Sequence, residues 1–522
     1  MTSVRFNDFA AKDPQGAAIV DPSGRCWSRG EVAGAVNRLA RSLREAGVQP
    51  GEVMAIVAPN CSEYLIAYLA GTQVGMLVVP VNWHLAPPEI QYILDDCKAQ
   101  VVVAHARCGA ALEKIAALMR HAPPIRLAIG GPVAGFTDVE EFTRGADDAP
   151  LEDPVTGRVL GYTSATTGKP KGVLLPLSGA DTTLDLAISR RVQVGMALET
   201  DVVLILSMLY HGAPLETAVV GLHMGNAVVL VDRMTPELSL QLIEKYKVTI
   251  LYVVPSMFSR LLALPEATRA RYSTASLQRV QHTGVACPVE IKRRMIDWWG
   301  PILWEAYAAA EGGGTLVGSA DWLKYPGTVG RPIPDTRVLI VDDDGRELPT
   351  GEAGTIYMTR YAGDRFEYLG DPQKTAAAHR GEYFSLGDIG YLNEEGFLFL
   401  CDRKIDMINL GGLKVYPAEI EGILILHPQV ADCAVIGVPE PVLGEAVMAI
   451  VQPAPDAKPG AELRSSITKF LSGHLGAAKI PQFIEFVPEL PREATGKLQK
   501  RRLREQYTSH AMARQGLRHG NG

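Results

Sequence analysis

The sequence lacks several features that would place it in a specialised class of protein. Its seven cysteines among 522 residues are odd in number and scattered, with no Cys-x-x-Cys pair, which favours neither a disulfide framework nor a zinc site and fits a reducing compartment. Positive charge is not in excess, because 51 Lys and Arg face 58 Asp and Glu, giving a net charge of −7. The chain therefore offers no overall positive field to a nucleic-acid backbone, and we expect no nucleic-acid partner.

Long uninterrupted hydrophobic runs are also missing. Residues 1–16 become charged before any long apolar stretch, unlike a secretory signal. One uncharged stretch, between Glu63 and Glu89, imitates a membrane span, but Pro80 falls where a bilayer helix needs continuous backbone bonding. We expect a buried helix followed by a core strand at 76–81 (MLVVPV), in a cytoplasmic protein without a membrane span.

What is present is ordinary globular composition, with 47% hydrophobic and 21% charged residues. The first half alternates apolar runs with helix-length amphipathic stretches such as 31–47 and 236–247. This alternation predicts an α/β fold in which helices cover a mostly parallel sheet. The strand-like runs are AIVAP (55–59), VVVAHA (101–106), VVLILS (202–207), AVVLVD (227–232) and TILYVVP (249–255).

The pattern of strand-like and helix-like segments changes twice after the first half of the sequence. Residues 325–400 contain short β-like pieces and Gly-rich turns, which predict a β-rich subdomain. After DRKID at 402–406 a smaller α/β pattern follows. We predict an N-terminal domain over 1–402, made of parallel α/β sheets plus the β-rich subdomain, and a small, mobile α/β C-terminal domain over 403–522.

The segment GYTSATTGKPKGV at 161–173 carries the strongest local signal. An apolar strand enters a loop rich in Thr, Ser and Gly that ends with two lysines, and such a loop offers N–H groups, hydroxyls and charge to phosphates. It is not a Walker A loop, because the glycine spacing is too long and Pro170 follows the first lysine. Taken alone, the segment fits an ordinary polar turn equally well.

Two further segments suggest a nucleotide site. WEAYAAAEGGG at 304–314 places Tyr307, which could stack on a base, before Glu311, which could hold Mg²⁺. In YFSLGDIGYL at 383–392, Asp388 could accept two ribose hydroxyls. Each has a structural alternative: a packed tyrosine, a solvated glutamate, and an aspartate that caps a turn.

Two segments near the carboxyl end complete the set. DRKIDMINLGGLKVYP at 402–417 combines Gly411 and Gly412 with Lys414, either as a channel free of side chains or as a simple hairpin turn. PREATGKLQKRRLR at 491–504 places Lys497 after a glycine, before further basic residues. A run of that kind usually forms a solvated face.

In their order, the five segments resemble the adenylate-forming superfamily of acyl-CoA synthetases, adenylation domains and luciferases. The resemblance extends over about residues 5–505. Supporting matches are MLYHGAP at 208–214, HTGVACP at 282–288, GTVGRP at 327–332 and GEAG at 351–354.

The resemblance implies an ATP-dependent, AMP-forming ligase: a carboxylic acid attacks the α-phosphate of ATP, giving an acyl-adenylate and pyrophosphate, and the acyl group then passes to CoA. It implies ATP, Mg²⁺ and CoA as cofactors and co-substrate. An anion must here attack a polyanion, so cations must already be in place. The resemblance assigns Lys497 and Mg²⁺ to that task, with Lys497 bridging the acid and the α-phosphate.

The resemblance also assigns the remaining site residues. The nucleotide would be bound by Thr163, Ser164, Thr166, Thr167, Gly168, Lys171, Gly284, Val285, Ala286, Tyr307, Ala310, Asp388 and Arg403. The acid would lie against Tyr210, His211, Gly212 and Ala308. Glu311 would ligate Mg²⁺, and Lys497, His211 and Glu311 would form the catalytic set. The small domain would turn about a hinge near Asp402 and Arg403, so that Lys497 serves the first half-reaction and a CoA channel of Gly411, Gly412 and Lys414 serves the second.

Three positions depart from the pattern of the superfamily. Ala165 and Ala308 stand where Gly is common, and Ala310 stands where Thr usually precedes the glutamate. The last change removes a hydroxyl expected to meet the AMP phosphate, a loss worth about 1.5–3 kcal/mol. We expect slower adenylation, but not a dead enzyme.

Three alternatives remain beside the acid–CoA ligase. In an amide bond synthetase an amine would capture the adenylate directly. An amino-acid adenylation domain fits less well, because no Asp near His211 is placed to pair with an α-ammonium and no carrier domain follows. A non-catalytic nucleotide sensor would bind ATP without releasing pyrophosphate. A homodimer is the assembly to test, since dimers are the commonest oligomers.

Overall fold

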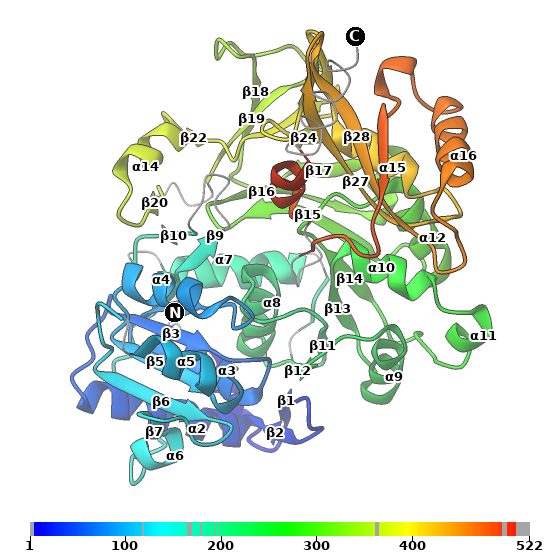
Figure 1. Cartoon of the computed structure of the whole chain (residues 1–522). Coiled ribbons are helices and arrows are strands. Elements are labelled where there is room, and N and C mark those ends of the chain that lie inside the picture. Colours follow the sequence, from blue (N-terminus) through cyan, green and yellow to red (C-terminus); the bar gives the residue numbers. More distant parts are fainter. Residues whose placement is uncertain are drawn as a thin grey trace.

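The computed structural model describes residues 5–116, 119–163, 170–177, 180–193, 195–197, 199–360, 365–492 and 498–507. Figure 1 shows its helices and strands, and the strands form four sheets. Three of the sheets precede residue 404, and the fourth follows it.

The first sheet has six strands, all parallel, in the order β7-β6-β5-β3-β4-β8. Its central strands are almost entirely Val, Ile, Ala and Leu, as is typical of strands buried on both faces. The strands are β3 (Val53–Val57), β4 (Leu77–Pro80), β5 (Val101–His105), β6 (Ile125–Ile129), β7 (Thr137–Asp138) and β8 (Arg158–Val159). The associated helices are α1 (Arg5–Lys12), α2 (Arg29–Glu45), α3 (Ser62–Gln73), α4 (Pro87–Asp96), η1 (Ala106–Cys108), α5 (Gly109–Ala116) and α6 (Val139–Phe142).

The second and largest sheet begins parallel and becomes antiparallel at β16. Its parallel part runs through β1 (Ala17–Val20), β12 (Ala227–Leu230), β11 (Val202–Ile205), β13 (Ile250–Val253), β14 (Arg279–His282) and β15 (Leu303–Ala309), with β2 (Cys26–Ser28) antiparallel at the edge. Its helices are α7 (Ala180–Gln193), α8 (Gly212–His223), α9 (Pro236–Tyr246), α10 (Pro255–Leu262), α11 (Glu266–Arg269), α12 (Val289–Trp299) and α13 (Ser319–Lys324).

Helices α2, α3 and α8 share one apolar core with both of these sheets. Helices α4 and α5 cover the other face of the first sheet, and α9, α10 and α12 cover the other face of the second. The result is alternating layers of helix and sheet, because each parallel sheet must bury both faces. The expected buried helix and core strand at 62–81 are α3 and β4, as predicted.

The antiparallel part of the second sheet confirms that residues 325–400 are rich in β-strands. Its strands are β16 (Gly312–Gly318), β17 (Thr328–Pro332), β24 (Leu398–Arg403), β23 (Asp388–Leu392), β19 (Gly354–Thr359), β22 (Tyr383–Phe384), β21 (His379–Arg380) and β18 (Val338–Val341). A separate small sheet pairs β9 (Gly161–Thr163), β10 (Lys171–Leu174) and β20 (Glu367–Tyr368), and α14 (Pro372–Ala378) follows β20.

The fourth sheet contains β26 (Leu413–Val415), β25 (Ile408–Leu410), β28 (Gly444–Pro453), β27 (Val430–Glu440) and β29 (Phe483–Phe486). Alternate residues of β28 pack on opposite faces: Val447, Ala449 and Val451 against α15 (Pro417–Leu424) and α16 (Ala461–Ser472), but Met448 and Ile450 against residues 498–507. A short turn, η3 (Ala477–Lys479), precedes β29, and residues 500–507 are helical.

The predicted fold class is therefore confirmed: large parallel α/β sheets, a β-rich part and a smaller α/β part. The division at residue 402 into two domains stays a prediction. Each of the seven cysteines is described, and none forms a disulfide. Among the described helices, none combines the length and the apolar character needed to cross a membrane.

Candidate active site

A cavity of about 1450 Å³ lies where the parallel strands of the second sheet end. Ser207, Val254 and Thr283, which follow β11, β13 and β14, line it together with the end of β15. Ligands of α/β proteins bind at the carboxyl ends of parallel strands, so the cavity occupies the expected place for a substrate.

The predicted acid-binding residues meet at this cavity. Tyr210, His211 and Gly212 line it, and so does Ala308. His211 is the N-cap residue of α8, where the chain turns from an extended segment into the helix. Its ring lies 4.4 Å from that of Tyr210, centroid to centroid. The four residues share one space, and their contact with an acid stays a prediction.

Strand β15 brings its side chains to the cavity by alternation. Ala306 and Ala308 line the cavity, whereas Glu305 and Tyr307 do not. The alternation ends at a register shift between Tyr307 and Ala309, after which Ala309, Ala310 and Glu311 all line the cavity. The Glu311 residue is only 5% exposed, and its carboxylate accepts a hydrogen bond of 2.9 Å from the Tyr368 hydroxyl.

The three glycines after Glu311 are required by the protein's own packing. A Cβ atom on Gly312 would lie 2.5 Å from the Arg360 side chain, one on Gly313 2.6 Å from the sulfur of Met358, and one on Gly314 2.7 Å from the carbonyl oxygen of Tyr307. All three have positive φ angles. They also line the cavity, and the close approach that glycine permits is used here by the chain itself.

Tyr307, Asp388 and Arg403 form a connected group. The Tyr307 hydroxyl donates a hydrogen bond of 2.6 Å to Oδ2 of Asp388, and Arg403 Nε lies 3.3 Å from Oδ1. Asp388 and Arg403 are direct partners on β23 and β24. Burial and the neighbouring Asp388 carboxylate raise the pKa of Tyr307. Arg403 lines the cavity, whereas Tyr307 and Asp388 lie behind it, so stacking on the base and ribose binding stay predictions.

The predicted phosphate-binding segment is described only at its ends. Thr163 lines the cavity, whereas Lys171 forms an ion pair of 3.3 Å with Asp371 and does not line it. The positions that lie outside the described residues are Ser164, Ala165, Thr166, Thr167, Gly168 and Lys169.

The predicted adenine segment follows β14. Gly284 and Val285 line the cavity, and Ala286 does not. Gly284 has a φ angle of 96° and therefore needs a residue without a side chain.

Lys497 itself lies outside the described residues, but its surroundings are informative. Arg492 and Gln499, which flank it in the sequence, both line the cavity. Arg492 is anchored by two bonds of 2.6 Å to Asp432. Both ends of the segment that carries Lys497 therefore reach the site.

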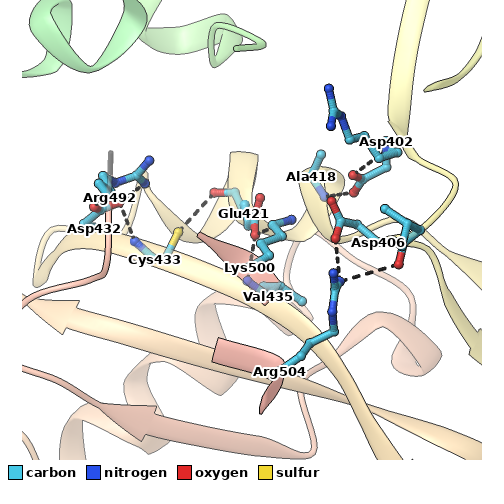
Figure 2. A network of polar contacts seen from close by, with 12 residues as sticks. Asp402, Asp406, Ala418, Glu421, Asp432, Cys433, Val435, Arg492, Lys500 and Arg504 are labelled. Carbon is cyan, nitrogen blue, oxygen red and sulfur yellow. Dashed lines mark hydrogen bonds and ion pairs between the residues drawn. The ribbon is translucent and has the colours of Figure 1, made fainter. Parts of the chain in front are cut away.

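The expectation of a solvated basic face after Lys497 is wrong for part of the run. Figure 2 shows the Lys500 side chain against Glu421 and Arg504 against Asp406. The Lys500 ammonium lies 2.9 Å from the Glu421 carboxylate. The Lys500 side chain is only 12% exposed. Although burial opposes the charged form, the nearby carboxylates of Glu421 and Asp402 raise the pKa of Lys500. These basic residues anchor the chain rather than meet solvent.

The predicted CoA-channel residues do not line the cavity in this arrangement. Gly411 and Gly412 have φ angles of 60° and 94° and form the two-residue turn between β25 and β26, so the hairpin alternative is correct for their backbone. Lys414 lies 3.4 Å from Asp343. A channel role would require the fourth sheet to adopt another orientation relative to the cavity, and it stays a prediction.

Several cavity residues were not found from the sequence. Arg191 lines the cavity and donates a bond of 2.7 Å to Gln281, and Tyr368 lines it beside Glu311. No local motif marks these residues, because their partners lie 90 and 57 positions away.

The possible metal ligands at the cavity suit a magnesium ion that is held mainly by the phosphates of a nucleotide. Across the described residues no group of three or more His, Cys, Asp or Glu side chains could hold a metal. Glu311 supplies one buried carboxylate at the cavity. Mg²⁺ is commonly bound by one or two carboxylates together with the phosphates of a nucleotide. Glu311 fits that pattern.

Two family profiles match the chain. The profile "AMP-binding enzyme" matches residues 6–362, and "AMP-binding enzyme C-terminal domain" matches residues 419–497.

Relatives of known function match over nearly the whole chain. The fatty acid–[acyl-carrier-protein] ligase ScoC of Streptomyces coeruleorubidus is 30% identical over 97% of this chain and 96% of that protein. The indoleacetate–CoA ligase of Aromatoleum aromaticum is 31% identical over 95% and 96%.

Solved structures match equally completely. ATP-bound MatB from Rhodopseudomonas palustris superposes with a TM-score of 0.84 at 27% identity, over 97% of this chain and 99% of that one. The amide bond synthetase McbA from Marinactinospora thermotolerans gives 0.82 at 25%, over 97% and 100%.

Proposed function

The chain belongs to the AMP-binding enzyme family and is an ATP-dependent, AMP-forming ligase, and we propose that it joins a carboxylic acid to the thiol of CoA. The observation that carries the proposal is the convergence of Thr163, His211, Gly284, Glu311 and Arg403 on one cavity. These residues come from five separate parts of the chain. The CoA ligase and the acyl-carrier-protein ligase that match it over nearly its whole length support the same chemistry.

Two half-reactions make up the proposed activity. A carboxylate oxygen attacks the α-phosphorus of ATP, the bond to the β-phosphate oxygen breaks, and pyrophosphate leaves. The sulfur of CoA then attacks the acyl carbonyl, the bond from carbonyl carbon to AMP oxygen breaks, and the thiol proton passes to solvent. Products are the thioester, AMP and pyrophosphate.

The residues of this chain would lower the first barrier by placing charge and by orientation. Lys497 would stand between the carboxylate and the α-phosphate, and the flanking Arg492 and Gln499 support its reach to the cavity. Glu311 would hold Mg²⁺, which when bound supplies positive charge to the phosphates. Asp388 and Arg403 would bind the ribose, with Tyr307 against the base.

The acid would enter beside His211 and extend between α3, α7 and α8. Tyr68 and Leu69 of α3, Leu184 of α7, and Leu215 and Val219 of α8 line that part of the cavity. Apolar residues outnumber polar ones on these walls, although Gln73, Arg191 and Glu216 also line them. The apolar majority favours a fatty or aromatic acid over a small polar one. We propose an acyl or aryl carboxylic acid as the substrate class.

A panel of acids tests the proposal. Each acid is incubated with ATP, Mg²⁺ and CoA, and products are identified by mass spectrometry together with pyrophosphate release. We expect AMP and a thioester with at least one fatty or aryl acid. Binding of ATP without acid-dependent pyrophosphate release would instead identify a nucleotide sensor.

An amide bond synthetase is the second candidate. Ala310 replaces the usual hydroxyl residue at the cavity, and the structure of McbA matches over nearly the whole chain. The same acid panel with amines in place of CoA separates the two functions. An amide product, with no thioester from any acid, would decide for the second candidate.

We also propose a cytoplasmic location, a mobile C-terminal domain over residues 403–522, and a homodimer as the assembly to test. Seven unpaired cysteines and the need for ATP and CoA support the location. Light scattering of the purified protein measures the assembly.

A further inference from the structure

The acid side of the cavity contains a group of polar side chains that the proposed mechanism does not use. Gln281 of β14 and Tyr252 of β13 line the cavity, although the two residues are only 8% and 2% exposed. Arg191 of α7 and Glu216 of α8 line it as well. These four residues form a polar cluster in a wall that is otherwise mainly apolar.

Strand register and helix geometry give the depth of the polar cluster. Tyr252 and Gln281 are direct partners in the parallel register of β13 and β14, so their side chains share one face of the sheet. Each lies two residues before the cavity-lining residue that follows its strand, which is about 6.6 Å along the strand. Glu216 lies five residues after His211, which is about 7.5 Å along α8. The polar cluster therefore lies well below His211, where the far end of a bound acid would reach.

Arg191 determines which way the Gln281 amide faces. Nη1 of Arg191 donates a hydrogen bond of 2.7 Å to Oε1 of Gln281, and Nη2 lies 3.3 Å from Oε1 of Glu216. A guanidinium can only donate, so the amide oxygen must face Arg191 and the NH₂ group must point elsewhere. The Arg191 side chain is itself only 15% exposed, which holds this arrangement in place. Gln281 therefore offers a ligand donors rather than an acceptor.

Two donors in the polar cluster are left over. Within the part of the chain that the structure describes, no residue accepts a hydrogen bond from Nε2 of Gln281, and none pairs with the Tyr252 hydroxyl. Burial raises the pKa of Tyr252, so its hydroxyl keeps the proton and can donate. Buried polar groups are normally hydrogen-bonded, because leaving one unpaired costs free energy. Two such groups on one wall of a cavity point to an acceptor on the ligand.

We propose that Gln281, oriented by Arg191, is a specificity-determining residue that selects acids carrying an oxygen acceptor at the end away from the carboxylate. Tyr252 supplies the second donor. The inference rests on the proposed function, because it takes this part of the cavity as the acid pocket. The substrate class is then an aryl or acyl acid with a distal ether, hydroxyl or carbonyl oxygen. An acid that ends in plain hydrocarbon would leave both donors unpaired.

Pairs of acids that share one shape test the proposal on the wild-type protein. The para-methoxy and para-ethyl derivatives of benzoic, phenylacetic and cinnamic acid differ in having oxygen or carbon at one distal position. The value of kcat/KM for each acid is measured by pyrophosphate release. We expect the methoxy acid to exceed its ethyl partner by about tenfold or more on at least one of the three scaffolds. Equal values within every pair would overturn the proposal.

Two variants of Gln281 separate its donors from its volume. Gln281→Met retains the approximate volume without the amide, and the ratio of methoxy to ethyl acid should fall to about one. Gln281→Glu retains an acceptor for Arg191 but presents no donor, so the ratio should fall below one and the para-amino acids should gain. A wild-type ratio in either variant would overturn the proposal.

Arg191→Met tests the positioning role of Arg191. The Gln281 amide would be free to turn its oxygen toward the ligand, so the ratio of methoxy to ethyl acid should fall and the para-amino acids should gain. Glu216 tolerates the loss of its partner, because its side chain is 58% exposed. An unchanged preference would show that Arg191 does not orient the amide.

Val219→Ala is the matched control, since Val219 is an apolar residue of α8 that also lines the cavity. It should change the two members of each pair alike. If it changes the ratio as much as Gln281→Met does, the ratio reports shape rather than hydrogen bonding, and the proposal fails.

A binding measurement keeps this outcome separate from the proposed function. The affinity of each acid is measured by calorimetry with an ATP analogue that cannot release pyrophosphate, so no turnover is needed. If the methoxy acid binds more tightly but no acid gives a thioester, the selectivity stands and the CoA ligase does not. If thioesters form without any preference within the pairs, the CoA ligase stands and the selectivity does not.

Discussion

The hydroxyl of Tyr307 donates a hydrogen bond of 2.6 Å to the carboxylate of Asp388, 81 positions later in the chain. The bond connects β15, which carries Ala308 to the cavity, with β23, whose partner strand carries Arg403. One hydrogen bond therefore couples Tyr307, the residue predicted to stack on the base, with Asp388, the residue predicted to bind the ribose.

Tyr307→Phe tests this coupling, because it retains the ring and removes the bond. A hydrogen bond to a charged group is worth about 1.5–3 kcal/mol. We expect the KM for ATP to rise by about tenfold or more, with little change in the KM for the acid. Steady-state kinetics with each substrate varied in turn measure both. An unchanged KM for ATP would show that Asp388 needs no orienting partner.

Lys497→Ala tests the charge assigned to the first half-reaction. We expect acid-dependent exchange of pyrophosphate into ATP to fall by about 10²–10³, the usual effect of one preorganised donor. Thioester formation from a preformed acyl-adenylate should be spared, because the acid and the α-phosphate are already joined and need no bridging cation. Equal losses in the two assays would contradict the division of labour between domain orientations.

Gly412→Leu tests the second half-reaction and should show the opposite pattern. A Cβ atom on Gly412 meets nothing within 4 Å in the present arrangement, so packing permits the substitution here, although the φ angle of 94° is strained for leucine. We expect normal pyrophosphate exchange and slow transfer to CoA, measured with preformed adenylate. If both half-reactions are normal, the turn does not line a CoA channel.

His282→Met tests the dependence of stability on pH. Burial, with a smaller effect of Lys292, holds the pKa of His282 well below its usual range. The unfolded chain therefore binds a proton below about pH 6.5 that the folded protein does not, and folding stability falls there by about 1.4 kcal/mol per pH unit. The variant lacks this contribution, so its unfolding free energy should fall less between pH 7.5 and 5.5. Denaturant melts at the two pH values measure the difference, and parallel losses would contradict it.

Much of the fold could be predicted because it follows from local pattern. Apolar runs of strand length alternate with amphipathic helices up to β14, and each predicted run became a strand of a parallel sheet. The convergence of His211 and Glu311 on one cavity followed from motifs whose order in the chain was visible.

What could not be predicted depends on partners distant in sequence. The basic run after Lys497 suggests a solvated face, yet the Lys500 side chain is only 12% exposed, because Glu421, 79 positions earlier, neutralises its charge. Glu305 carries no local sign of its burial, since the facing of its side chain depends on the register of β14 and β15. Burial of a charge is set by the fold, not by the residue's neighbours in the sequence.

The distribution of thiols has a practical consequence for testing the proposed motion of residues 403–522. Of the seven cysteines, Cys26 on the edge strand β2 is the exposed one. Burial raises the pKa of the other six thiols, which slows their reaction because the thiolate is the nucleophile. A maleimide dye should therefore attach at Cys26 in the native chain, and a second cysteine introduced on the helix α16 would complete a donor–acceptor pair for single-molecule fluorescence.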